Sequence, residues 1–176
     1  MELKFEELPY QLDAVNAVAN LFAGQPNHAR TFDLTSQGMG RFVGNGLDLD
    51  WETLGRNLNA VQKQNGQPET EIGADRWNFS LEMETGTGKT YVYLRTIYEL
   101  NRRYGWKKFV IVVPSVPIRE GVLKSLEMTK AHFDGVFGRP VMRYSEYSST
   151  RLSDLRAFAV NDHIEILVIN IQSFEK

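Results

Sequence analysis

The chain has 176 residues, of which 42% are hydrophobic and 24% are charged, and its formal net charge at pH 7 is −2. This is typical of a soluble globular domain with a substantial core, and so small a charge neither favours nor excludes a nucleic-acid partner. The absence of cysteine excludes disulfides and thiolate metal sites and suits a cytoplasmic protein. No apolar run approaches the roughly 20 residues that cross a bilayer, so we expect no membrane partner.

The first 76 residues predict two helices separated by polar loops. Pro9 and apolar side chains at helical spacing predict a helix over residues 8–22. From 23 to about 76 the composition shifts towards Gly, Asn, Gln and Asp. Within this stretch Asp50 is placed to cap the start of a second helix. The polar stretch 62–73 then has the Gly- and Pro-containing texture of a mobile loop.

The second half alternates strands with helices. Large apolar residues at every second position of 77–83 predict a strand. A helix is predicted after the glycine turn that follows, and Gly105 is placed to end it. Apolar runs and helical spacing then predict further strands and helices, namely strands at 108–113, 140–144 and 164–170 and helices at 115–133 and 151–159. This order indicates an α/β fold, with a mainly parallel sheet flanked by helices.

Residues Met83–Thr90 read METGTGKT and match the phosphate-binding loop pattern of Gly, four residues, then Gly-Lys-Ser/Thr. The glycines let backbone N–H groups turn inward around phosphate oxygens, where a Cβ would interfere. Position 83 is Met where the pattern has Gly. The motif also requires a strand before it and a helix after it, and both are predicted. The sequence therefore predicts a nucleotide site at Thr85, Gly86, Thr87, Gly88, Lys89 and Thr90.

This loop indicates ATP and Mg²⁺ as the bound species. Lys89 is expected to reach the terminal phosphates, and the Thr90 hydroxyl is expected to bind Mg²⁺. These two are the candidate catalytic residues. The positive end of the helix that begins here adds to the attraction for phosphate.

Three stretches of the chain resemble the amino-terminal motor lobe of the restriction subunit of type III restriction-modification enzymes: METGTGKTYVYLRTIYEL, KKFVIVVPSVPIREGV and ILVINIQSF. Those subunits are superfamily-two helicase-like ATPases. The resemblance implies a partial RecA-like (P-loop NTPase) domain, with 1–176 as an incomplete first motor lobe. Its parts would be an adenine-side helix at 1–22, an insertion at 23–76 and a P-loop α/β core at 77–176. The insertion could pack over the adenine, present a partner surface or form a flexible connection.

The same resemblance implies roles for individual residues. Gln11 would read the adenine through its amide. Ser115 and Arg119, in PSVPIREGV, would contact the DNA sugar-phosphate backbone, and so would three residues after the last predicted strand, Asn170, Gln172 and Ser173. Each also has a plainer interpretation, as a surface helix residue, a solvated helix charge or part of a turn.

In the resembled enzymes, ATP drives movement or a change of state along double-stranded DNA, a separate nuclease domain cuts, and a modification (methyltransferase) subunit is the expected partner. Hydrolysis also requires acidic residues at the end of an apolar strand. The strands predicted here end at Pro114 and Asn170 without an Asp-Glu pair. We therefore expect a fragment that binds ATP without hydrolysing it, from a parent that is an ATP-dependent type III site-specific deoxyribonuclease.

Two other classes of function remain open. The chain could be part of another superfamily-two helicase acting on DNA or RNA, or a non-hydrolysing nucleotide-binding interaction module. The missing acidic pair favours the module for this chain alone, and PSVPIREGV favours a motor for its parent. If later sequence supplies the strands beside the phosphate loop, the sheet has an unpaired apolar edge, and we expect self-association.

Overall fold

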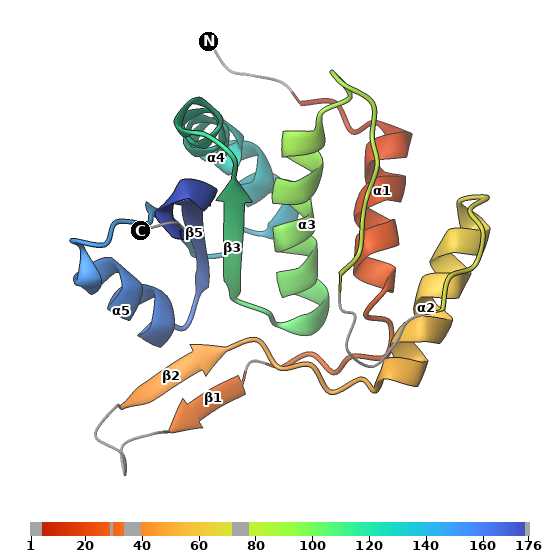
Figure 1. The fold of residues 1–176 in the computed structure, drawn as a ribbon, viewed down its shortest axis with the longest axis horizontal. Coiled ribbons are helices and arrows are strands. Elements are labelled where there is room, and N and C mark those ends of the chain that lie inside the picture. The colour runs from red at the N-terminus through yellow and green to blue at the C-terminus, as the bar shows by residue number, and fades with distance from the viewer. Residues whose placement is uncertain (1–4, 29, 34–39, 72–77, 175–176) are drawn as a thin grey trace. The chain divides into compact units, whose positions relative to one another are not determined.

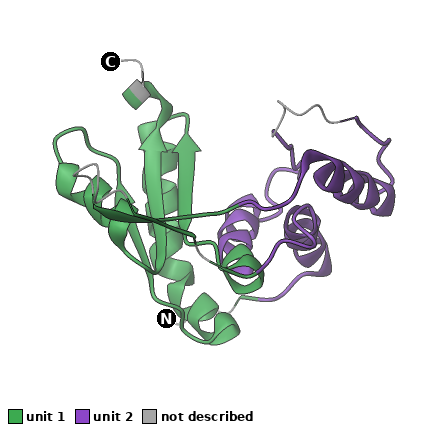
Figure 2. Ribbon diagram, turned by 90° about the horizontal axis from the view of Figure 1, so that it is seen from below, with its two compact units in different colours: residues 1–5, 27–46, 100–176 green, residues 6–26, 47–99 purple. Residues whose placement is uncertain are grey.

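The computed structural model describes residues 5–28, 30–33, 40–71 and 78–174. They form two compact units, coloured separately in Figure 2. The sheet unit comprises Met1–Phe5, Asn27–Gly46 and Leu100–Lys176, and the helical unit comprises Glu6–Pro26 and Leu47–Glu99. The fold is α/β with a parallel three-stranded sheet flanked by helices, consistent with a partial RecA-like domain, as predicted.

The helical unit contains α1 (Pro9–Asn20), α2 (Trp51–Gln64) and α3 (Lys89–Tyr104) as far as Glu99 (Figure 1). All three helices were predicted. Proline occupies the first turn of α1, where its missing N–H costs no helical hydrogen bond. Helix α3 continues beyond Glu99 into the sheet unit and is followed by Gly105, whose φ of +68° allows the chain to turn there.

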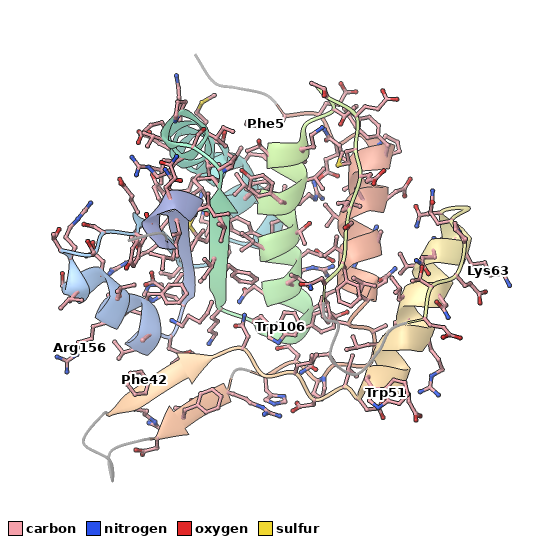
Figure 3. The ribbon with its side chains drawn as sticks, in the orientation of Figure 1. Phe5, Phe42, Trp51, Lys63, Trp106 and Arg156 are labelled. Carbon is pink, nitrogen blue, oxygen red and sulfur yellow. The ribbon has the colours of Figure 1, made fainter. Side chains whose placement is uncertain are left out.

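Helix α2 is capped as the sequence predicts and is tied to the end of α1. The Asp50 carboxylate accepts a hydrogen bond from the Thr53 N–H at 2.7 Å. Hydrogen bonds from the Thr53 side chain and, to a lesser extent, from this N–H hold the pKa of Asp50 below its ordinary value. Trp51 lies beside this cap at the N-terminal end of the helix (Figure 3). The Asn57 side chain donates to the carbonyls of Leu21 and Ala23 at 3.0 Å each, which satisfies acceptors at the end of α1.

The stretch 23–76 contributes to both units. Helix α2 belongs to the helical unit, and a hairpin of β1 (Arg30–Asp33) and β2 (Arg41–Gly44) belongs to the sheet unit. The sequence did not predict this antiparallel hairpin, because each strand has only four residues and lies within a polar, Gly-rich composition.

The sheet unit is built on β3 (Lys108–Val113), β4 (Met142–Glu146) and β5 (Ile164–Asn170), which pair in parallel in the order β3-β5-β4. Helices α4 (Val116–Phe137) and α5 (Leu152–Val160) provide the connections, and a short 3₁₀ helix, η2 (Ile171–Phe174), follows β5. All of these elements except η2 were predicted. Every residue of β5 is buried, as expected for a central strand covered on both faces.

Strand β3 lies at one edge of this sheet and leaves apolar side chains uncovered. Val110 and Val112 are 50% and 51% exposed. They point to the same face as Lys108, whose amine lies over the Phe158 ring of α5, so α5 covers only one end of this face of β3. Within the described residues, β5 is the only neighbour of β3. Among the described residues, the sheet therefore has an unpaired edge with exposed apolar side chains at β3.

The predicted strand at 77–83 does not form over its described part, residues 78–83. Trp77 lies outside the described residues, and residues 78–83 pair with no described strand. Phe79, Leu81 and Met83 keep the alternation of a strand, but a strand is stabilised only by backbone pairing with a neighbour. Leu81 remains 44% exposed. The alternation of apolar residues is thus present here, but the backbone pairing that would form a strand is not.

Side chains anchor the start of β3 to the segment after β2. The Asn45 amide accepts from the N–H groups of Lys107 and Lys108 and donates to the Lys108 carbonyl. The indole N–H of Trp106, labelled in Figure 3, donates to the Gly46 carbonyl at 2.8 Å. Burial lowers the pKa of Lys108, whose amine donates to the Asn161 carbonyl.

Among the described helices, none is long and apolar enough to span a bilayer.

We expect Val112→Lys to reduce self-association of the chain, because a lysine on an exposed edge strand opposes pairing with a second copy. Sedimentation velocity over a range of protein concentrations measures this. Leu152→Lys provides the matched control, since Leu152 is 71% exposed and begins helix α5, not an edge strand. An unsubstituted chain that stays monomeric at every concentration would contradict the expectation.

Candidate functional site

The predicted phosphate loop takes its shape from two glycines in left-handed backbone conformations. Gly86 has a φ of +83° and Gly88 a φ of +86°, which a residue with a Cβ adopts only with strain. A Cβ at Gly86 would have no neighbour within 4 Å, so the loop is open there. Met83 is not among the residues with positive φ. The first position of the motif therefore does not require glycine in this chain.

The loop is closed on its own lysine. The Lys89 ammonium donates to the carbonyls of Met83 and Glu84, at 2.7 Å each. The Thr87 hydroxyl donates to the same Glu84 carbonyl at 2.7 Å. Lys89 is also the first residue of α3 and is exposed. The ammonium is thus already directed into the turn that the sequence assigns to phosphate.

The first turn of α1 contacts the loop through one carbonyl oxygen. The buried Gln11 side chain donates from Nε2 to the Thr87 carbonyl at 2.9 Å, and the Tyr10 hydroxyl donates to the same atom at 3.3 Å. A Cβ at Gly88 would lie 2.5 Å from Gln11 Nε2. Glycine at 88 therefore serves two purposes, because it permits the turn and leaves room for the Gln11 amide.

A second contact fixes the chain just before α1. The Arg95 guanidinium, on α3, bonds to the Glu7 carboxylate at 2.8 Å and to the Tyr91 hydroxyl at 2.7 Å. Glu7 and Arg95 are 88 positions apart, so no sequence pattern could have paired them. This ion pair holds the segment that leads into Gln11.

Thr90, the expected magnesium ligand, is half-buried in the first turn of α3. It hydrogen-bonds with Tyr93, whose pKa is raised by burial and lowered to a lesser extent by that bond. A hydroxyl oxygen has two lone pairs, so this contact leaves capacity for a metal. Thr85 is exposed at the start of the loop.

The residues present fit a phosphate chain and its magnesium. Left-handed glycines, an inward ammonium and the N-terminal end of a 16-residue helix are the donors that phosphate oxygens require. No group of three or more His, Asp or Glu side chains among the described residues is arranged to hold a metal alone. That does not disagree with magnesium, which commonly takes few protein ligands and binds substrate phosphates.

The residues expected to contact DNA lie at the carboxyl edge of the sheet. Val113 and Asn170 are register partners at the ends of β3 and β5, so the segments that follow them leave the sheet side by side. Ser115 comes two residues after Val113 and is the N-cap of α4, without a side-chain capping bond. All five predicted residues, Ser115, Arg119, Asn170, Gln172 and Ser173, therefore belong to one edge of the sheet unit.

These residues differ in how accessible they are. Asn170 is buried, and its side-chain oxygen accepts from the Gln172 N–H at 3.2 Å. Asn170 therefore shapes the turn that carries Gln172, which is exposed, and Ser173, which is half-buried.

Arg119 is held by two carboxylates. Its Nη1 atom lies 2.6 Å from Glu146 Oε1 and its Nη2 atom 2.9 Å from Glu120 Oε1. Glu146 is the last residue of β4 and belongs to none of the motifs in the sequence. Only the pairing of β4 with β5 brings this carboxylate to the edge that holds Arg119.

The family model for "Type III restriction enzyme, res subunit" matches residues 4–176. The Res subunit of EcoPI from Escherichia phage P1 is 34% identical over 143 residues, which are 79% of this chain and 14% of the relative. The Res subunit of EcoP15I from Escherichia coli is 33% identical over 144 residues, with the same coverage.

A third relative matches over a shorter stretch. The StyLTI Res subunit from Salmonella typhimurium is 49% identical over 61 residues, which are 34% of this chain and 6% of the relative. The family match covers nearly the whole chain, whereas the chain spans about one seventh of the first two relatives. This protein therefore belongs to the family of type III restriction enzyme res subunits.

Proposed function

We propose that the chain is the ATP-binding part of the DNA-translocating and cleaving subunit of a type III restriction endonuclease in the cytoplasm. In the intact enzyme it binds ATP with Mg²⁺, contacts the backbone of double-stranded DNA and works with a modification (methyltransferase) subunit. The observation that carries the proposal is the closed phosphate loop, in which Lys89 points inward and Gln11 touches Thr87.

Phosphate binding follows from the partners of Lys89. Its ammonium bonds to two neutral carbonyls, Met83 and Glu84. A charge-assisted bond to a phosphate oxygen is stronger than a bond to a neutral acceptor, so the ammonium transfers to phosphate when a nucleotide binds. The Thr90 hydroxyl supplies the protein ligand to magnesium, which neutralises charge on the terminal phosphates.

Adenine selection follows from the Gln11 amide. Nε2 keeps one hydrogen beyond the bond to Thr87, and Oε1 makes no hydrogen bond to any described residue. Adenine offers a donor and an acceptor on one edge, which an amide matches with both atoms, whereas the corresponding edge of guanine offers two acceptors. ATP is therefore preferred over GTP.

DNA binding is assigned to the carboxyl edge of the sheet. Open α/β sheets bind ligands beyond the carboxyl ends of their strands. Ser115, Arg119, Gln172 and Ser173 offer hydroxyl, guanidinium and amide donors, which suit phosphate oxygens. Asn170 supports the turn that presents Gln172 and Ser173. Backbone contacts of this kind position the enzyme and carry no sequence information.

We propose further that this stretch of chain binds ATP without turning it over. Strands β3 and β5 end at Val113 and Asn170, without the acidic pair that hydrolysis needs. The carboxylate at the end of β4, Glu146, is paired with Arg119. Family membership favours a restriction enzyme over an RNA motor or a nucleotide-sensing module.

Lys89→Ala is expected to weaken ATP binding by about 10- to 100-fold, the usual value of a charge-assisted hydrogen bond. Isothermal titration calorimetry with ATP and Mg²⁺ measures this on the full chain. Lys63→Ala removes an exposed lysine of α2 in the same unit and is expected to bind like the unsubstituted chain. If Lys89→Ala bound ATP as tightly as the unsubstituted chain, the assignment of the nucleotide site would be wrong. If the unsubstituted chain released phosphate from ATP at steady state and Lys89→Ala did not, the proposal that this chain does not hydrolyse ATP would be wrong.

Gly88→Ala is expected to weaken ATP binding and to remove the preference for ATP over GTP, because its Cβ would displace Gln11 from Thr87. Gly66→Ala is the matched control, since Gly66 also has a positive φ, +65°, but no atom within 4 Å of the added Cβ. Competition of ATP and GTP against a fluorescent nucleotide measures the preference. Gln11→Ala should lose it to the same extent, and a Gly88→Ala chain that still prefers ATP would contradict the explanation.

A further inference from the structure

We propose that Glu146 pairs with the Arg119 guanidinium in the DNA-free protein and that a DNA phosphate displaces it. Glu146 thereby sets the affinity of the protein for the DNA backbone and the dependence of that affinity on salt. The inference rests on the proposed DNA role of Arg119 and adds to it a residue that opposes binding.

The geometry places a carboxylate on each terminal nitrogen of the Arg119 guanidinium. Nη1 contacts Glu146 at 2.6 Å and Nη2 contacts Glu120 at 2.9 Å. The third nitrogen, Nε, is buried and makes no hydrogen bond to any described residue. Arg119 binds carboxylates and phosphates through the same planar set of N–H donors. A phosphate that takes the donor now directed at Glu146 or at Glu120 must therefore displace that carboxylate.

The two carboxylates do not hold Arg119 equally. The Arg119 side chain is 18% exposed, and those of Glu146 and Glu120 are 30% and 60% exposed. Solvent screens an exposed pair more strongly, so the Glu146 contact contributes more. Glu146 is also fixed by the pairing of β4 with β5, whereas Glu120 is the helical neighbour of Arg119.

The position of Arg119 explains why a carboxylate is present. The residue lies in the first turn of α4, where the positive end of the helix dipole disfavours a cation. Glu146 compensates for this in the absence of DNA. Once a phosphate binds, the displaced carboxylate is a like charge beside it, and the repulsion weakens the complex.

Glu146→Gln is therefore expected to bind DNA more tightly, about fivefold at low salt, which is the value of one partly exposed ion pair. The plot of log affinity against log salt concentration should steepen by up to about 0.9, the contribution of one phosphate contact. Arg119→Ala should weaken binding and flatten the plot, and Glu146→Gln/Arg119→Ala should match Arg119→Ala. Fluorescence anisotropy with a labelled DNA duplex, titrated at several KCl concentrations, measures all of these on the full chain.

Glu127→Gln is the matched control. It removes one negative charge from an exposed position farther along α4 and is expected to leave affinity and slope unchanged. Thermal unfolding of each variant checks that the sheet unit stays folded. Should Glu146→Gln be unstable, Glu146→Asp keeps the charge but shortens the side chain, and is expected to shift affinity and slope in the same direction.

The outcomes separate this inference from the function on which it rests. If Arg119→Ala weakens binding but Glu146→Gln behaves like Glu127→Gln, Glu146 does not compete with phosphate and the inference is wrong. If Arg119→Ala has no effect, or if neither the unsubstituted chain nor Glu146→Gln binds DNA, the DNA contact at Arg119 is wrong as well. ATP binding through Lys89 is measured independently and is unaffected by either result.

Discussion

The proposed nucleotide site depends on how closely the Gln11 amide approaches the backbone at Gly88. A side chain at 88 would come within 2.5 Å of Gln11 Nε2, so glycine is the residue that lets α1 and the loop meet at the Thr87 carbonyl. The ion pair of Glu7 and Arg95 holds the chain that leads into this contact. The shape of the loop and the position of the amide that we propose reads adenine are therefore consequences of the same constraint.

Two cations in the molecule are held by acceptors of different kinds. Lys89 bonds to neutral carbonyls, which an incoming phosphate would replace at little electrostatic cost. Arg119 bonds to carboxylates, which keep their charge when they are displaced. Lys89 and Arg119 are both basic residues in the first turn of a helix. The neighbours of Lys89 would not repel an anion, whereas the carboxylates beside Arg119 would.

Local signals in the sequence predicted most of the fold. The cap at Asp50, the proline in the first turn of α1 and the apolar runs of β3 and β5 each act over a few residues, and each is found. The strand at 77–83 failed over its described part, because strand formation depends on a partner that local alternation does not reveal. The same limit applies to the sites. The phosphate loop is a contiguous motif, whereas the contacts of Arg119 with Glu146 and of Arg95 with Glu7 join residues that only the tertiary structure brings together.

Met83 has a consequence for the recognition of related loops. The residue does not have the left-handed torsion that would exclude a side chain, and its carbonyl, which any amino acid supplies, is what contacts Lys89. A motif search that demands glycine at this place would pass over the chain. A motif that requires glycine only where the backbone φ is positive, at positions 86 and 88, and accepts any residue at position 83 would include it.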